Sequence, residues 1–153
     1  MVVFRLVRER FSSSLSGKGA ALRGARWNSV GVELIYTAGN RSLAMAEVAV
    51  HLSLATLPSD YLMMSINVPN DMSIGELKAS DLPANWNAFP HPLSTRRLGD
   101  AFVSDAQYAV LKAPSVVTQG DFNYLINPKH PDFRHIHVES LERFPFDRRL
   151  FKS

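Results

Sequence analysis

A single carboxylate, Glu47, interrupts an apolar stretch and is the residue of this sequence best placed for chemistry. It lies in "LAMAEVAVHL" (43–52), where every other residue except one histidine is apolar. Removing an unpaired carboxylate from water is costly, so Glu47 should meet a cation, accept hydrogen bonds or face a cleft. In a cleft with little water, its charge can stabilise positive charge that develops on a substrate.

Histidines are the second group of residues that could take part in chemistry. His135 and His137 alternate in "HIHV" (135–138) and would share one face of a strand, which is a geometry that zinc ligands can have. No third ligand stands nearby at a familiar spacing, so surface or structural histidines and no metal site are expected. A nuclease that relies on His130, His135 or His137 stays open as a minority hypothesis.

Known phosphate-binding loops are absent from the sequence. There is no G-x-G-x-x-G after a strand and no Walker loop, and "GARWNSVG" (24–31) has the spacing of neither. These observations exclude the Rossmann and P-loop classes.

Length and composition favour one globular domain, residues 1–153. The chain is 46% hydrophobic and 20% charged, with no cysteine and a net charge of +3. Without cysteine there are no disulfides, thiolate metal sites or cysteine nucleophiles. No stretch approaches the roughly 20 apolar residues of a membrane helix, and the first residues do not resemble a secretory signal. We therefore expect a soluble cytoplasmic protein.

The elements that position Glu47 follow from the hydrophobic pattern. A helix from about Ser42 to Leu54, capped by Asn40 or Ser42, would be apolar on most sides and therefore buried on most sides. Strands are expected at 2–7, 32–37, 61–68 and 135–144, a helix and then a short strand ending near Pro114 within 99–120, and loops over 12–26 and most of 75–100. Strands at both ends with helices between them indicate an α+β domain.

Several ordered motifs resemble the RES-domain family. They are "LSGKGAALRGARWNSVGVELIYTAGNRSLAMAEVAVHL" (15–52), "APSVV" (113–117) and "NYLINPKHPDF" (123–133), and the resemblance covers nearly the whole chain. The family, named for an arginine, a glutamate and a serine, contains the toxins of bacterial toxin–antitoxin pairs. The resemblance implies mixed or antiparallel sheets with flanking helices, similar to ADP-ribosyltransferases and diphtheria-toxin-like domains, and an enzyme that consumes NAD.

The resemblance also assigns candidate site residues. The family arginine falls on Arg26 of "GARWN", where Ala25 replaces the preceding family glycine, and the glutamate falls on Glu47. The serine is Ser115. The expected catalytic residues are Glu47, Arg26, Tyr36 and Ser115, and the expected NAD-binding residues are Arg5, Arg26, Tyr36 and Ser115.

These residue types suit cleavage of the nicotinamide–ribose bond, which places positive charge on the sugar. Glu47 would stabilise that charge. Arg5 and Arg26 would bind the pyrophosphate and pair with Glu47 in the empty enzyme. Tyr36 would stack on nicotinamide or hydrogen-bond the ribose, and Ser115 would hydrogen-bond the ribose or the amide.

The function implied is therefore a toxin that depletes NAD by hydrolysis or phosphorolysis and arrests growth. A protein ADP-ribosyltransferase is the main alternative; an RNase-type toxin and a non-catalytic binding module with a structural Glu47 also stay open. The implied partner is an Xre-like helix-turn-helix antitoxin whose C-terminal segment blocks the active site, in a complex that can contain a toxin homodimer. No direct binding to nucleic acid or membrane is expected.

Overall fold

The fold is built on one sheet. The structure, a computed structural model, describes residues 1–151. Within them the strands are β1 (Val2–Arg8), β2 (Ile35–Ala38), β3 (Tyr61–Asn67), β4 (Ile74–Glu76), β5 (Val110–Pro114), β6 (Phe122–Ile126) and β7 (His137–Arg143). They form a seven-stranded sheet in the order β4-β5-β6-β2-β1-β3-β7. Only β4 and β5 pair in parallel among these strands, so the sheet is mixed and largely antiparallel.

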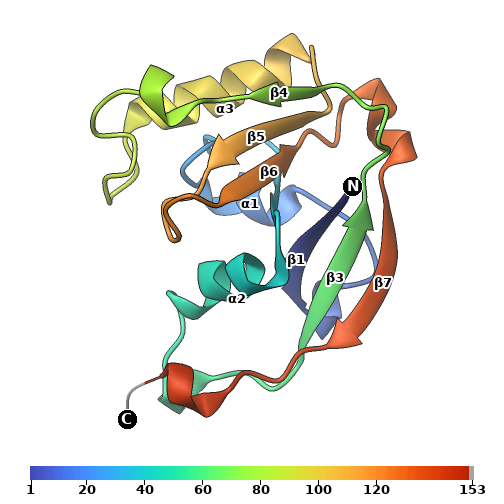
Figure 1. The fold of residues 1–153 in the computed structure, drawn as a ribbon, viewed down its shortest axis with the longest axis vertical. Helices are drawn as coiled ribbons and strands as arrows, with labels where there is room; N and C mark the ends of the chain where they lie inside the picture. The colour runs from blue at the N-terminus through green and yellow to red at the C-terminus, as the bar shows by residue number, and fades with distance from the viewer. Residues whose placement is uncertain (152–153) are drawn as a thin grey trace.

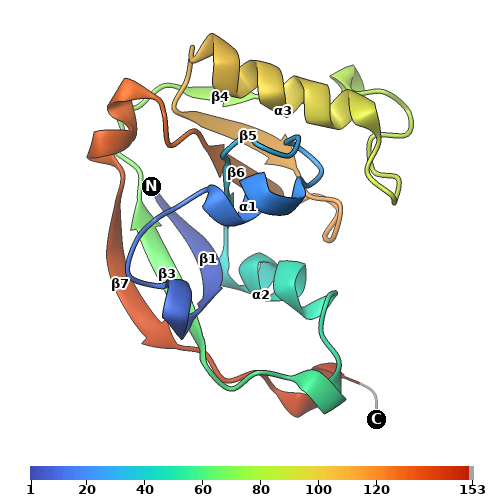
Figure 2. The ribbon, with the colours of Figure 1, turned by 180° about the vertical axis from the view of Figure 1, so that it is seen from behind.

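The sheet has two arms that meet at β1 and β2. The β1–β2 pairing has one register pair, Phe4 with Ala38, whereas β1 and β3 pair along their whole length. In Figures 1 and 2 the β4-β5-β6 arm runs across the molecule, and the β1-β3-β7 arm descends steeply from it. Helix α2 and a cavity both lie against this junction.

Three α-helices occur within residues 1–151: α1 (Lys18–Arg23), α2 (Arg41–Ala49) and α3 (Leu93–Asp105). Short 3-10 turns cover Glu9–Phe11, Leu54–Thr56, Ala79–Asp81, Pro131–His135 and Arg148–Leu150. Helix α2 packs on β1 and β2, and α3 lies along the β4-β5-β6 arm (Figure 2). None of the helices in the described part of the chain has the length and apolar character needed to cross a bilayer.

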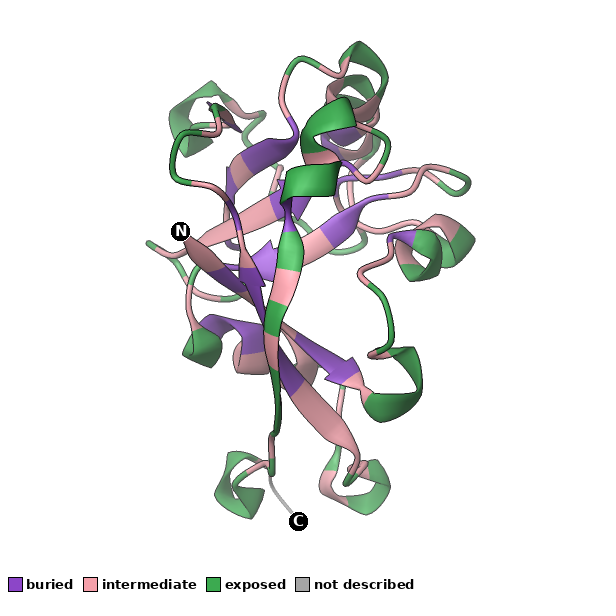
Figure 3. Cartoon of the chain, turned by 90° about the vertical axis from the view of Figure 1, so that its right-hand side faces the viewer, coloured by how far each residue is buried: buried purple, intermediate pink, exposed green. Residues whose placement is uncertain are grey.

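The core follows the sheet in three clusters of buried side chains. The largest includes Val3, Ile35, Ile66 and Ile126. A second joins α2 to β1 and β3 and includes Leu6, Leu43 and Met63, whereas the third lies under α3 and includes Trp27, Leu34 and Leu125. Figure 3 shows these buried strand positions and the largely exposed edge strand β7.

Most expected elements are confirmed. The α+β class is correct, the strands expected at 2–7, 61–68 and 135–144 are β1, β3 and β7, and α3 precedes a strand that ends at Pro114. The strand expected at 32–37 begins only at Ile35. The short strand β4 was not expected, because its three residues are too few for an alternating pattern.

Two expectations were wrong. The segment 12–26 was expected to be a loop, but Lys18–Arg23 forms α1 between Gly17 and Gly24, since its alanines, leucine and arginine favour a helix. Helix α2 ends at Ala49 instead of Leu54 and buries only Leu43 and Ala44, with Val50 59% exposed. It lies on one side of the sheet only, so its other faces are left to a cavity and to solvent.

Candidate active site

A cavity of about 490 Å³ lies between α2, the β1–β2 junction and the segment that precedes α3. This is within the size range of small-molecule sites, roughly 300 to 1,000 Å³. Its walls include Phe4, Arg5, Arg26, Trp27, Tyr36, Glu47, His51, Phe89, His91 and Asn123. Four of the five sequence-predicted site residues therefore lie on one cavity, and Ser115 lies immediately behind it.

Glu47 is held on α2 by a well-defined helix start. The Asn40 side-chain oxygen accepts a 2.8 Å hydrogen bond from the backbone N–H of Leu43, and Asn40 Nδ2 donates to Asp121. Of the two caps considered, Asn40 is therefore the one used. The helix carries Glu47 to the cavity wall about two turns after Asn40, where its side chain is half-buried.

The environment of Glu47 favours its protonated form more than water does. Desolvation raises the pKa of the carboxyl, whereas hydrogen bonds from Asn123 and Ser115 and the charges of His51 and Arg26 act in the opposite direction. The expected ion pairs with Arg5 or Arg26 do not form: neither arginine makes a salt bridge to Glu47 among the described residues. The reason is that both guanidinium groups bind backbone carbonyls instead.

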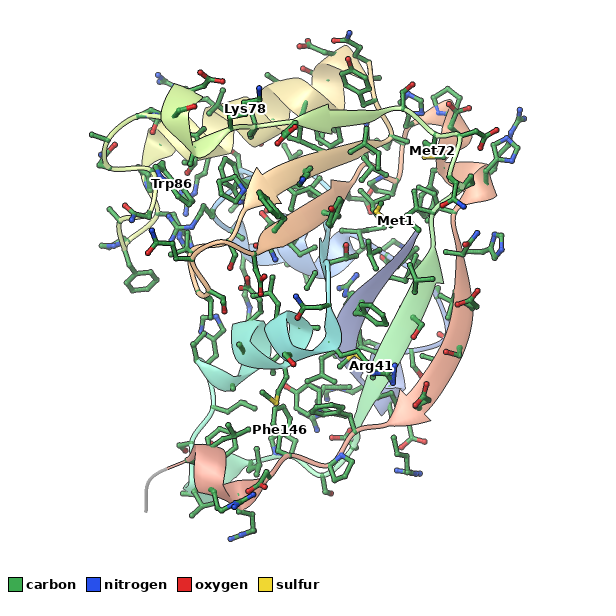
Figure 4. All side chains as sticks on the ribbon, viewed as in Figure 1. Met1, Arg41, Met72, Lys78, Trp86 and Phe146 are labelled. Carbon is green, nitrogen blue, oxygen red and sulfur yellow. The ribbon has the colours of Figure 1, made fainter. Side chains whose placement is uncertain are left out.

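Arg26 connects two walls of the cavity. Its Nη1 donates to the carbonyl oxygens of Trp86 and Ala88, at 2.7 and 2.9 Å, and so fixes the segment before α3. Trp86, labelled in Figure 4, also stacks on Trp27 with ring centroids 6.4 Å apart. Burial lowers the pKa of Arg26, although the nearby carboxylate of Glu47 opposes this effect. A guanidinium has five N–H donors, so Arg26 keeps donor capacity for an anionic ligand.

Arg5 enters the cavity from the other arm of the sheet. It lies on β1, and its Nη1 donates to the carbonyl of Ser16 at 3.0 Å, which ties the segment before α1 to the sheet. Burial lowers the pKa of Arg5. The cavity therefore has guanidinium groups on two different elements, which is a suitable arrangement for a ligand with separated negative charges.

Tyr36 presents its ring to the cavity while its hydroxyl is used elsewhere. The hydroxyl donates to Asn28 Oδ1 at 2.6 Å and accepts from the backbone N–H of Trp27 at 3.0 Å. Asn28, fully buried, donates in turn to the carbonyls of Ala20, Ser29 and Val32. Tyr36 thus holds the loop that carries Arg26, and a direct hydrogen bond from its hydroxyl to a ribose would break these contacts.

Ser115 supports Glu47 from behind the cavity wall. Its Oγ donates to Glu47 Oε1 at 3.3 Å and accepts from the backbone N–H of Thr118 at 3.0 Å. Only 4% of Ser115 is exposed, and it does not line the cavity, although its neighbours Pro114 and Val116 do. In this structure the serine therefore orients the carboxylate, and it does not reach the space where a ligand would bind.

Sequence reasoning gave no site role to four residues that the structure brings to this region. His51, four residues after Glu47, lines the cavity, and its helical spacing was a usable signal. Asn28 lies in the motif "GARWN" (24–28), but no site role was assigned to it there. Asn123 and His91 come from distant segments with no local signal; desolvation, then the charges of Arg26, Arg96 and His51, lowers the pKa of His91.

The other histidines lie away from this cavity. His135 ends a 3-10 turn and His137 begins β7, both exposed, and His130 caps the same turn. Within residues 1–151, no group of three or more His, Cys, Asp or Glu residues is placed to hold a metal ion. His135 and His137 share an exposed side with buried Ile136 between them, as expected, but only His137 belongs to the strand, because β7 starts after His135.

A half-buried carboxylate, two arginines and several aromatic side chains line one cavity of this α+β domain. The RES domain family matches residues 2–147 of the chain. The chain therefore belongs to the RES-domain family.

Curated relatives agree with this membership. The chain is 34% identical over 144 residues to the "Prs ADP-ribosylating toxin" of Sphingobium sp. (strain YBL2), with 93% of this chain and 89% of the relative covered. It is 33% identical over 156 residues to a "Toxin Res" of Photorhabdus laumondii, with 100% and 99% covered.

A solved structure shows the same fold. A chain of the M. tuberculosis MbcT–MbcA toxin–antitoxin complex aligns with a TM-score of 0.76 at 17% identity, and the alignment covers 97% of this chain and 85% of that one. At this identity the likeness establishes the fold alone.

Proposed function

We propose that this protein is a toxin that consumes NAD by breaking its nicotinamide–ribose bond. The observation that carries the proposal is Glu47, a desolvated carboxylate without a salt bridge among residues 1–151, on the wall of a cavity that also contains Arg5 and Arg26. The names of the relatives, which include an ADP-ribosylating toxin, support the same chemistry.

The proposed roles follow from the charges. When the C1′–N bond breaks, its electron pair stays on nicotinamide and the ribosyl ring becomes positive; Glu47 stabilises that charge until a nucleophile adds to C1′. Arg5 and Arg26 bind the pyrophosphate through the N–H groups that their carbonyl contacts leave over. The Tyr36 ring packs against nicotinamide, and Ser115 orients Glu47.

The acceptor of the ADP-ribosyl group is water or phosphate in this proposal, and a protein side chain is the second candidate. The second candidate is favoured by the relative named for ADP-ribosylation. As a toxin, the protein would act in the cytoplasm and need restraint by an Xre-like antitoxin that closes the cavity. The similar fold in a toxin–antitoxin complex supports such a partner.

The test is to incubate purified, antitoxin-free protein with NAD, with and without phosphate, and to separate the products by chromatography. Free ADP-ribose without phosphate indicates hydrolysis, a phosphate-dependent product indicates phosphorolysis, and transfer of label from NAD to proteins of a bacterial extract indicates ADP-ribosylation. We expect Glu47→Gln to lower the rate of nicotinamide release by at least about 100-fold.

The matched control is Glu139→Gln, which removes the same charge from an exposed position of β7. It should release nicotinamide at the wild-type rate. The proposal fails if Glu47→Gln keeps that rate, or if the wild-type protein releases no nicotinamide in any of the three assays.

A further inference from the structure

Helix α3 forms hydrogen bonds to the loop that carries Arg26, both before and after that residue. Arg96 Nε donates to the carbonyl of Ala25 at 3.2 Å. One helical turn later, Asp100 accepts from the backbone N–H of Ser29 at 2.9 Å and from its hydroxyl at 2.5 Å. Residues four apart lie on the same face of a helix, so a single face of α3 fixes the loop before and after Arg26.

In the middle of this face, the backbone of α3 contacts the backbone of the loop. A Cβ built on Gly99 would lie 1.6 Å from the carbonyl oxygen of Trp27, far inside any permitted contact. Gly99 is fully within α3 and buried, so the contact depends on the missing side chain. The residue after Arg26 is therefore pressed directly against the helix.

Helix α3 is itself anchored to the sheet. The fully buried Asn127 donates from Nδ2 to the carbonyl of Val103 at 3.2 Å, and Phe102 and Val103 pack with Trp27 and Leu125. Together with the Tyr36–Asn28 contact on its other side, the helix gives the loop a fixed position relative to the sheet. Neither Arg96 nor Asp100 lines the cavity, so both can act on a ligand only through the loop.

We propose that Arg96 and Asp100 are positioning residues that hold Arg26 in the geometry required for substrate binding. The inference rests on the proposed function, in which Arg26 binds the NAD pyrophosphate. Displacing a binding group by about 1 Å can cost on the order of 100-fold in rate. The backbone that carries a long, otherwise flexible arginine must therefore be held in place. The hydrogen bonds of Arg96 and Asp100 fix this backbone from outside the cavity.

The test combines steady-state kinetics for NAD with amide hydrogen exchange in Asp100→Ala and Asp100→Asn. We expect Asp100→Ala to raise the NAD KM about 10-fold or more with a smaller change in kcat, since a binding contact is loosened. Exchange at residues 25–29 should accelerate while exchange in β1 and β3 stays at the wild-type rate. Asp100→Asn, which keeps an acceptor oxygen for the Ser29 N–H, should recover part of both effects.

Asp105→Ala is the matched control, because Asp105 lies exposed on the same helix and makes no side-chain hydrogen bond within residues 1–151. It should change neither KM nor exchange. Unchanged exchange at 25–29 in Asp100→Ala, or faster exchange across the whole sheet, overturns the positioning role. A wild-type protein that consumes no NAD overturns the proposed function instead, and the exchange result then still decides whether α3 holds the loop.

Discussion

The hydroxyl of Ser115 donates a 3.3 Å hydrogen bond to Glu47, 68 residues away in the sequence. This contact joins the turn after β5 to α2 across the base of the cavity. Because the serine is buried and the carboxylate lines the cavity, the pair places an oriented carboxylate where a ligand can reach it.

Ser115→Ala should move the acid limit of NAD consumption to higher pH. The hydrogen bond from Ser115 favours the ionised form and so lowers the pKa of Glu47; without it the pKa rises further. If the carboxylate is the active form, the rate falls as pH drops through that pKa. A pH–rate profile measures the shift, and Ser140→Ala on β7 serves as the control. If the acid limb of the profile is not shifted in Ser115→Ala, Ser115 does not influence the ionisation of Glu47.

Glu47→Gln should make the fold more stable at neutral pH, not less. The folded-state pKa of Glu47 lies above its usual 4.5, so the ionised side chain destabilises the fold at pH values above the folded pKa. Below the unfolded pKa both states are protonated and the effect disappears. The melting-temperature difference between variant and wild type should therefore shrink as pH falls toward 4.5. A large loss of melting temperature in the variant would favour a purely structural Glu47.

Tyr36→Phe should lower both stability and NAD affinity. The change leaves buried Asn28 Oδ1 without its donor and the Trp27 N–H without its acceptor, which costs roughly 1 to 3 kcal/mol. The loosened loop then weakens the contact of Arg26 with NAD. Tyr124→Phe is the control, since its hydroxyl makes no hydrogen bond in the described residues. Denaturant unfolding and KM are the measurements, and equal behaviour of the two variants would contradict the role of Tyr36.

Gly99→Ala should abolish most NAD consumption. The new Cβ would collide with the Trp27 carbonyl, so either α3 or the Arg26 loop must move, at a cost of about 1 to 3 kcal/mol. Gly19→Ala is the matched control: it also lies in a helix, but nothing lies within 4 Å of its Cβ position. The control should be neutral or slightly stabilising. Wild-type activity in Gly99→Ala would show that the contact has no bearing on the site.

Asn40→Ala should destabilise α2 by about 1 kcal/mol through loss of the N-cap, which corresponds to roughly 2 to 4 °C in melting temperature. Ser42→Ala, the other candidate cap, should change little because its side chain makes no hydrogen bond among residues 1–151. Thermal unfolding by circular dichroism compares the two. A larger loss in Ser42→Ala would reverse the assignment of the cap.

The sequence predicted the features that local pattern controls. Alternating and β-branched residues predicted β1, β3 and β7, and the apolar run with one carboxylate predicted a helix in which Glu47 loses water. The ordered motifs around Arg26, Glu47 and Ser115 indicated the RES-domain family, which the comparison confirmed. The short elements α1 and β4 were not predicted, because six and three residues carry little periodic signal.

Only the tertiary structure decided which groups meet. Pairing of β2 with both β1 and β6 brings Ser115 and Asn123 to Glu47, and the position of α3 brings Arg96, Gly99 and Asp100 to the Arg26 loop. The tertiary structure also leaves α2 covered on one side only. In it, the guanidinium groups of Arg5 and Arg26 donate hydrogen bonds to backbone carbonyls. A local pattern determines whether a side chain favours helix, strand or burial. Its partners depend on strand order and helix packing, which residues far apart in the chain fix together.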